Sequence, residues 1–346
     1  MSYILRSRAF PFSANGRIPI DLAFLAPAQG AMKSPEIASL TLRVNCVVDV
    51  VGAALVGEDM CRALDDVRVR DQGGDRVALR GIELREVQLE ESGSTFADPP
   101  SLGIGAGQTM EFTISIPLSP ARAARSADFR INVAELLNGG EILLGCPAAA
   151  FAANGTILSG TYEVYAVIVD GLHPEAKSRA TWIGYNATNA EDYYPVFGAL
   201  RSAFAIAPDT TGAASMTTID TIDSTTLGYV AIPRSVLAEV YRQGAYSLDA
   251  ATDNVTQGNA FSIIAPTRHG KQTTMRGAGR VHVRFSSALP TNSRVVICAI
   301  TDRVASNSRA ILGADLGKLA AETTSGRRLV TSLSSATAAR LPVRVG

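Results

Sequence analysis

The sequence has few of the residues that catalysis and metal binding usually require. It contains three histidines, His173, His269 and His282, with no HxH, HxxxH or HExxH spacing. A histidine-based metal site would therefore lack its ligands. No GxSxG elbow occurs, and no Cys/His pair is suggested by spacing. We therefore expect no enzymatic activity, no catalytic residue, no cofactor and no metal site, and we interpret His282 as a surface residue on the polar side of a strand.

Cysteine and long apolar runs are also scarce. The four cysteines, Cys46, Cys61, Cys146 and Cys298, lie far apart without a CxxC spacing. Cys46 and Cys298 fall inside apolar strand patterns, where a free cysteine behaves as a small hydrophobic residue. This pattern favours free thiols over a disulfide framework. The N-terminal sequence lacks the apolar core of a signal peptide, and no apolar run reaches the ~18 residues of a membrane span, so we expect a soluble chain.

Charge of either sign is not in excess, since 32 basic residues balance 32 acidic ones. No global field therefore points to nucleic acid or membrane. The distribution is uneven, however. From residue 303 onward only Asp315 and Glu322 oppose seven basic residues, which gives this tail a charge of +5 and leaves −5 for the rest of the chain. The basic residues of the tail are Arg303, Arg309, Lys318, Arg327, Arg328, Arg340 and Arg344.

What the sequence does contain is strand pattern, most clearly in the run LTLRVNCVVDVV from Leu40 to Val51. Its even-numbered residues are apolar and its odd-numbered residues are mostly polar, which predicts a long strand with one core face. A short strand at Val67–Arg70 follows. The stretch 71–75, with its paired glycines, then predicts a hairpin turn, and a charged helix is expected from Gly81 onward.

Residues 1–38 carry Pro11, Pro19, Pro27 and Pro35 at regular spacing. Proline at this density excludes a helix and disfavours a central strand, so we predict an extended N-terminal arm. A second alternating strand is predicted at Met110–Leu118. The glycine cluster GIGAG just before it is followed by a strand rather than a helix, so it does not fit a dinucleotide-binding loop.

The run Thr161–Val169 is apolar at both parities, as expected of a strand that is buried on both faces. The turn after it is the predicted domain boundary. The second half then repeats the plan of the first, with strands at Phe197–Ile206, Leu227–Ile232, Ala260–Ile264 and Val295–Thr301 and a helix at Arg234–Gln243. An internal duplication about 150 residues apart is the simplest account.

We therefore predict an all-β protein made of two tandem jelly-roll β-sandwiches, with short helices and extended terminal arms. The predicted ranges are 1–38 for the N-terminal arm, 39–172 for the first jelly roll, 173–302 for the second, and 303–346 for the C-terminal arm. Aromatic residues gather near the boundary between the rolls. They could form a sugar-binding platform, but packing between the rolls is the preferred interpretation; they are Tyr162, Tyr165, Trp182, Tyr185, Tyr193 and Tyr194.

The segment Arg17–Leu22, the long strand, the GGDRVALRG turn with its helix and the duplicated plan resemble the double jelly-roll major capsid proteins of the tectivirus, corticovirus and adenovirus lineage, in particular those of tailless icosahedral bacteriophages. The resemblance implies a capsid protein with no catalytic residues, which forms homotrimeric pseudo-hexagonal capsomers. It implies contacts with neighbouring capsomers and with penton or minor capsid proteins, and a place in the virion after assembly in the host cytoplasm. Many such viruses carry a membrane beneath the shell.

The basic tail is expected to lie inside such a shell, where an internal membrane or packaged DNA would present phosphates. The residues offered to phosphate are Arg303, Arg309, Lys318, Arg327 and Arg328. The alternative for the tail is an arm that clamps neighbouring capsomers. Two alternatives remain for the whole chain: a secreted lectin-like or adhesin β-sandwich protein, and an enzyme on a tandem jelly-roll scaffold, which would need a convergent cluster of His, Asp and Glu.

Overall fold

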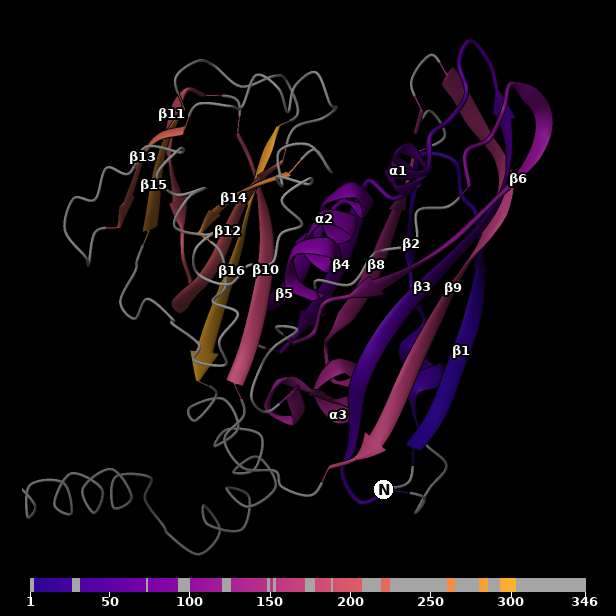
Figure 1. Cartoon of the computed structure of the whole chain (residues 1–346). Helices are drawn as coiled ribbons and strands as arrows, with labels where there is room; N and C mark the ends of the chain where they lie inside the picture. Colours follow the sequence, from indigo (N-terminus) through magenta and orange to yellow (C-terminus); the bar gives the residue numbers. More distant parts are fainter. Residues whose placement is uncertain are drawn as a thin grey trace, which may run out of the picture.

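The computed structural model describes residues 3–26, 32–72, 74–92, 100–119, 126–147, 150–151, 154–171, 178–187, 189–206, 219–224, 260–264, 280–285 and 293–302. In this part of the chain the strands form a five-stranded, an eight-stranded and a three-stranded sheet (Figure 1). Together these sheets build two jelly-roll sandwiches, which confirms the predicted all-β fold class.

The first jelly roll packs the five-stranded sheet against one half of the eight-stranded sheet. The five-stranded sheet has the order β1 (Tyr3–Pro11), β9 (Gly155–Asp170), β3 (Pro35–Val50) and β6 (Gly105–Ile116), with β7 (Ile131–Asn132) also paired to β3. The facing strands have the order β2 (Gly16–Pro19), β8 (Glu141–Cys146), β4 (Asp66–Asp71) and β5 (Gly74–Leu79). Apolar side chains from the two sheets fill the space between them.

The predicted long strand is β3, and its alternation is observed residue by residue. All its even-numbered residues from Leu40 to Val50 are buried, at no more than 1% exposure. The strand starts five residues earlier than predicted, at Pro35. An irregularity in its pairing between Ile37 and Ser39 resets the parity, so that Ile37 and Leu40 both face the core.

The hairpin and the helix after it are also confirmed. Strands β4 and β5 pair directly, and Gly74 has the positive φ of 106° that the turn needs. Helix α2 (Gly81–Ser92) starts where a glycine is required, because a Cβ at Gly81 would collide with the carbonyl oxygen of Cys61. Short helices α1 (Gly57–Met60) and η2 (Cys61–Ala63) precede the hairpin. No helix in the described part of the chain is long and apolar enough to cross a membrane.

The second jelly roll repeats this plan. One sheet has the order β10 (Ser178–Asn186), β16 (Arg294–Asp302), β12 (Ala199–Ile206) and β14 (Ala260–Ile264). The facing sheet has the order β11 (Glu191–Pro195), β15 (Arg280–Phe285) and β13 (Ile219–Ser224). The predicted strand 227–232, the predicted helix 234–243 and the whole tail 303–346 lie outside the described residues.

The prediction of an arm over residues 1–38 is wrong for the part that the structure describes. Strand β1 pairs with β9 over nine residues, β2 pairs with β8, and Leu22–Leu25 forms a 3-10 helix. The prolines fit because they stand at strand ends: Pro11 closes β1, Pro19 closes β2 and Pro35 opens β3. The other predicted boundary, between residues 172 and 173, falls among undescribed residues and stays a prediction.

One further helix was not predicted. The apolar run after Phe129 supplies only the two residues of β7 and then turns into α3 (Val133–Leu137). Asn132 caps this helix, since its side chain accepts a hydrogen bond of 2.8 Å from the amide of Ala134. A 3-10 helix, η3 (Ser126–Phe129), precedes it.

Candidate functional site

The described residues contain no group of three or more His, Cys, Asp and Glu that could hold a metal ion. The features that distinguish this molecule are surfaces instead. One is the joint at which the two jelly rolls meet, and the other is the outward side of the sheet β1-β9-β3-β6. We describe the joint first because it determines how the rolls stand relative to each other.

The joint is a short parallel strand pairing. Strand β10 of the second roll lies beside β5 of the first, with Trp182 opposite Val77 and Ile183 opposite Ala78. This pairing merges one sheet of each roll into the continuous eight-stranded sheet (Figure 1). Trp182 is fully buried and belongs to the same apolar cluster as Leu84 and Val87 of α2. The largest side chain of the chain is thus part of the contact between the rolls.

A buried ion network lies at one end of the joint. Asp71 ends β4, and Nε of Arg76 donates to its Oδ2 at 2.5 Å. Arg179 of β10 approaches the other carboxylate oxygen of Asp71 at 3.0 Å and also donates to the carbonyl of Gly74 at 2.6 Å. Asp71 and Arg76 have fully buried side chains. One carboxylate of the first roll is therefore shared between an arginine of its own hairpin and an arginine of the second roll.

A second ion pair connects helix α2 to the second roll. Arg294 of β16 donates from Nε to the buried carboxylate of Glu83 at 2.8 Å. The same guanidinium donates to the carbonyl of Gly184 at 2.7 Å and to Asn186 at 2.7 Å. Burial raises the pKa of the Glu83 carboxyl, while Arg294 and the backbone amide of Arg80 act in the opposite direction. Gly184 leaves the room for this pair, because a Cβ there would lie 2.6 Å from a Glu83 oxygen.

Ion pairs with a buried carboxylate contribute little net stability. Their desolvation cost offsets much of the Coulomb gain, but removing one partner costs about 3–5 kcal/mol because a charge is left in the interior. Each pair also requires one particular geometry of the two rolls. We conclude that the joint holds both rolls in a fixed relative orientation.

The second feature is the outward side of the sheet β1-β9-β3-β6, which we call the outer sheet face. The inward residues of β9, from Tyr162 to Ile168 at every second position, are fully buried, whereas the outward Tyr165 and Val167 are half-buried. The side chains around them are mostly small. Strand registers place the following residues on this face: Leu5, Ser7, Ala9, Ser39, Thr41, Arg43, Glu111, Thr113, Ser115, Glu163, Tyr165 and Val167.

The charges of the outer sheet face are paired with one another. Arg43 donates to Glu111 at 2.8 Å and to Glu163 at 3.2 Å, and the Tyr165 hydroxyl donates to Glu163 at 2.5 Å. The hydrogen bond from Tyr165 and the Arg43 guanidinium lower the pKa of Glu163. The face therefore consists of mostly small side chains around an ion network of one arginine and two glutamates.

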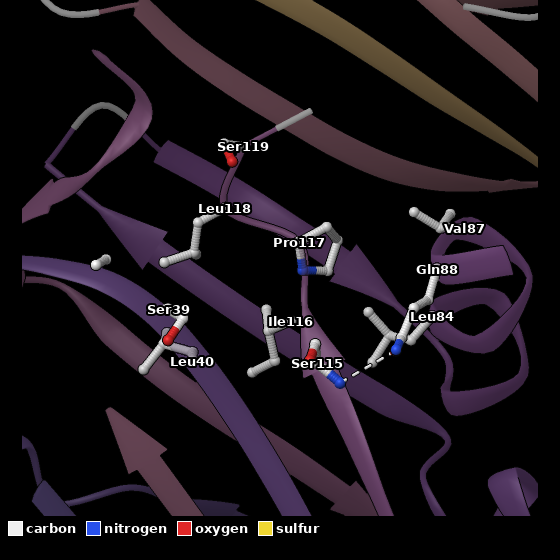
Figure 2. Close-up of a pocket in the computed structure, with 11 residues that line it drawn as sticks. Ser39, Leu40, Leu84, Val87, Gln88, Ser115, Ile116, Pro117, Leu118 and Ser119 are labelled. Carbon is white, nitrogen blue, oxygen red and sulfur yellow. Dashed lines mark hydrogen bonds between the residues drawn. The ribbon is translucent and has the colours of Figure 1, made fainter. Parts of the chain in front are cut away.

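The structure also contains an apolar cavity of about 200 Å³ between α2 and the ends of β3 and β6 (Figure 2). Its walls include Leu40, Leu84, Val87, Ile116 and Leu118. The side chain of Gln88 accepts a hydrogen bond of 3.3 Å from the backbone of Ser115 at the rim (Figure 2). The other polar side chains in the wall are the hydroxyls of Ser39, Ser115 and Ser119, so the cavity offers few polar groups with which to select a ligand.

The candidate residues of the sequence have two different outcomes. The proposed phosphate contacts, Arg303, Arg309, Lys318, Arg327 and Arg328, lie outside the described residues. The interpretation of His282 as a surface residue is wrong. His282 is 6% exposed, its Nε2 lies 2.7 Å from a Glu191 oxygen, and its ring stacks on Tyr193 at 4.2 Å. It is covered because β15 is the central strand of its sheet and β11 lies alongside.

The aromatic residues near the boundary do not form one platform. Tyr162 lies in the core of the first roll and Trp182 lies at the joint, each with no exposed surface. Tyr185 and Tyr194 contact each other inside the second roll, with ring centres 6.0 Å apart. Packing between the rolls, the preferred interpretation, describes Trp182 but not the others.

Sequence reasoning missed the residues of the joint. Asp71, Glu83 and Arg294 are charged residues in patterns that ordinarily face solvent, and their partners are up to 211 positions away. The one available signal is that the run from Gly81 continues directly from a hairpin with no loop between them. In the structure, every residue from Gly81 to Val87 of this helix is buried.

Comparison with known proteins identifies solved structures with a similar fold. No protein-family profile and no curated protein sequence matches this chain. Among solved structures, the major capsid protein of STIV, Sulfolobus turreted icosahedral virus, matches with a TM-score of 0.53 and 10% identity over 87% of this chain and 96% of that one. A chain from the atomic structure of that virus matches with a TM-score of 0.57 and 9% identity, over 93% of this chain and 97% of that one.

VP54 of the virus PBCV-1, fitted into a reconstruction of the virophage Sputnik, gives a TM-score of 0.51 and 8% identity over 87% of this chain and 94% of that one. At such identities the similarity shows the fold alone. The chain thus has the double jelly-roll fold of these viral capsid proteins, and the match extends over nearly the whole length of each of them.

Proposed function

We propose that this chain is the major capsid protein of an icosahedral virus. The observation that carries the proposal is the double jelly roll itself, with two rolls of equivalent strand order fixed side by side by one continuous sheet and two buried ion networks. The matching structures reported above include the major capsid protein of STIV, of which the match covers 96%. Each copy in a shell must keep a defined orientation relative to its neighbours. A fixed joint between the rolls keeps the contact surfaces of one copy in a constant relative orientation.

The proposed assembly is a homotrimer of pseudo-hexagonal outline. Two equivalent rolls per chain supply six similar corners when three copies form a closed ring. Such capsomers would contact each other and penton or minor capsid proteins, and they would enclose the genome. The virion is the proposed location, with assembly in the host cytoplasm, and the resemblance of the sequence favours a bacteriophage. The proposed capsid function requires no enzymatic activity of the chain.

Size-exclusion chromatography with light scattering and negative-stain imaging of the purified chain test this function. Trimers of hexagonal outline are expected. A monomer at all accessible concentrations that binds sugars on a glycan array would overturn the proposal in favour of the lectin-like alternative. A monomer with hydrolytic or transfer activity would overturn it in favour of an enzyme.

The tail is proposed to lie on the inner side of the shell, with Arg303, Arg309, Lys318, Arg327 and Arg328 available to phosphates of packaged DNA or of an internal membrane. Many such contacts add up in a shell, and they weaken with salt through counterion release. A chain ending at Asp302 should still form trimers, but its shells should lack part of their genome or membrane content. If trimers of the shortened chain fail to join at all, the tail is a clamp between capsomers instead.

A further inference from the structure

The outer sheet face has a counterpart in the second roll. Strand β1 pairs with β9 over nine residues, and β10 pairs with β16 over nine residues in the same antiparallel manner. The next strands are β3 and β6 in the first roll, and β12 and β14 in the second. The sheets β1-β9-β3-β6 and β10-β16-β12-β14 are thus equivalent layers of the repeated plan, and their outward sides can be compared position by position.

In the second roll this outward side is covered by the first roll. Ala180 and Trp182 lie on it with at most 1% exposure, and the missing Cβ of Gly184 would point at Glu83 of α2. Directly opposite Trp182 and Gly184 on β16 are Cys298 and Val296, which are fully buried. Two elements of the first roll make this contact: η3, whose Phe129 forms a buried cluster with Ala180 and Ile300, and α2, whose Glu83 pairs with Arg294. Figure 1 shows α2 between the two rolls.

In the first roll the equivalent positions are open. Counting from the first residue of β1 and of β10 matches Leu5 with Ala180, Ser7 with Trp182 and Ala9 with Gly184. Leu5 is 59% exposed, and Ser7 and Ala9 are exposed as well. Their neighbours on β9, Val167 and Tyr165, are half-buried. The outward side of this sheet is therefore covered by protein in the second roll and exposed to solvent in the first.

The outer sheet face is suited to being covered. Each charged group at its centre already has a partner, because Arg43 pairs with both Glu111 and Glu163. One arginine against two glutamates leaves a net charge of −1, which a partner would have to meet with a cation or a hydrogen-bond donor. The remaining side chains are short, which lets another surface approach closely. Leu5 and Val167 supply the apolar area that drives association.

We propose that the outer sheet face is the surface on which a second copy of this chain places its second jelly roll, in the way that α2 and η3 of the first roll cover β10 and β16. This inference rests on the proposed function and names the contact within its trimer. The chain's own second roll cannot be the occupant, because it joins the first through β5, in the opposite sheet. The contact is head-to-tail, and three such contacts close a ring.

The test compares two leucine substitutions in the full-length chain. Leu5→Asp places a carboxylate on the outer sheet face, and Leu137→Asp makes the same change at α3, where Leu137 is 40% exposed and away from this face. Light scattering after size exclusion should show the mass of a trimer for the wild type and for Leu137→Asp. Leu5→Asp should raise the concentration for half-assembly by about 10-fold to 100-fold, as expected for a central contact residue.

Ser7→Arg is the second probe, because it adds bulk at an exposed position without burying anything in the monomer. The melting temperature of each variant, measured on the dissociated protein, should equal that of the wild type. Backbone amides of β1 and β9 should exchange more slowly with deuterium in the trimer than in the monomer.

Trimers of unchanged affinity in both Leu5→Asp and Ser7→Arg would overturn this inference while leaving the capsid function intact. A wild-type chain that never self-associates would overturn both. Unchanged deuterium exchange in β1 and β9 on assembly would show that another face makes the contact.

Discussion

Removing the shared carboxylate of the joint should weaken the contact between the rolls far more than removing a surface carboxylate of the same hairpin. Asp71→Ala takes away the carboxylate that pairs with Arg76 and Arg179, of which Arg76 has no exposed side-chain surface. Breaking a buried ion pair from one side costs about 3–5 kcal/mol. Asp75→Ala is the matched control, since Asp75 pairs with Arg70 at 2.8 Å with side chains 30% and 42% exposed. A pair of this kind contributes about 0–1 kcal/mol.

The single tryptophan of the chain makes the effect measurable at the joint itself. Trp182 is fully buried beside β5, so its fluorescence should shift to longer wavelength when the rolls separate. In urea titrations followed by this fluorescence, Asp71→Ala should move the transition to clearly lower denaturant, while Asp75→Ala should leave it nearly unchanged. Circular dichroism followed in parallel reports the loss of strands, and a fluorescence transition that comes first would show that the joint opens before the rolls unfold.

Equal transitions for Asp71→Ala and Asp75→Ala would refute the reasoning. They would mean that the joint depends on apolar packing around Trp182 alone, and that the ion network adds neither stability nor orientation. Asp71→Asn refines the result, because it keeps an acceptor for one arginine while removing the charge. It should fall between the wild type and Asp71→Ala.

Three further predictions use the same structure. Burial raises the pKa of Cys46 to about 11 and that of Cys146 to about 12, so both thiols stay protonated and inaccessible at pH 8. Mass spectrometry should therefore find no alkylation of the native chain by iodoacetamide and complete alkylation in denaturant. Rapid labelling of the native chain would contradict the buried placement of these cysteines. Gly184→Ala forces a Cβ to within 2.6 Å of Glu83 and should lower the free energy of unfolding by about 1–3 kcal/mol, whereas Gly103→Ala meets nothing within 4 Å and should show no change in the same denaturation assay. In the dissociated chain, Leu42→Ala empties a fully buried position of β3 and should cost about 2–5 kcal/mol, while Leu5→Ala at 59% exposure should stay within about 0.5 kcal/mol. Similar melting temperatures for these two dissociated variants would argue against the assigned inward and outward sides.

The alternation of strand residues and the position of the hairpin turn could be predicted from the sequence, because both depend on residues that are close together in the chain. The alternation from Leu40 to Val50 predicted β3 and its core side, since a strand exposes every second residue to the same environment. The paired glycines at 73 and 74 predicted the turn between β4 and β5. The repeated order of such elements predicted two jelly rolls, and it did so with no sequence match to any curated protein.

Only the tertiary structure decided which charged residues are buried and where the prolines stand. Asp71 with Arg179, and Glu83 with Arg294, meet because β10 lies beside β5, and no local pattern carries that pairing across more than 100 residues of chain. Prolines between apolar residues indicate an arm and a series of edge strands equally well. Pairing with β9 makes β1 a strand, because its backbone groups find partners 150 or more residues away. Long-range contacts of this kind depend on how the whole chain closes, which the neighbours of a residue in the sequence do not determine.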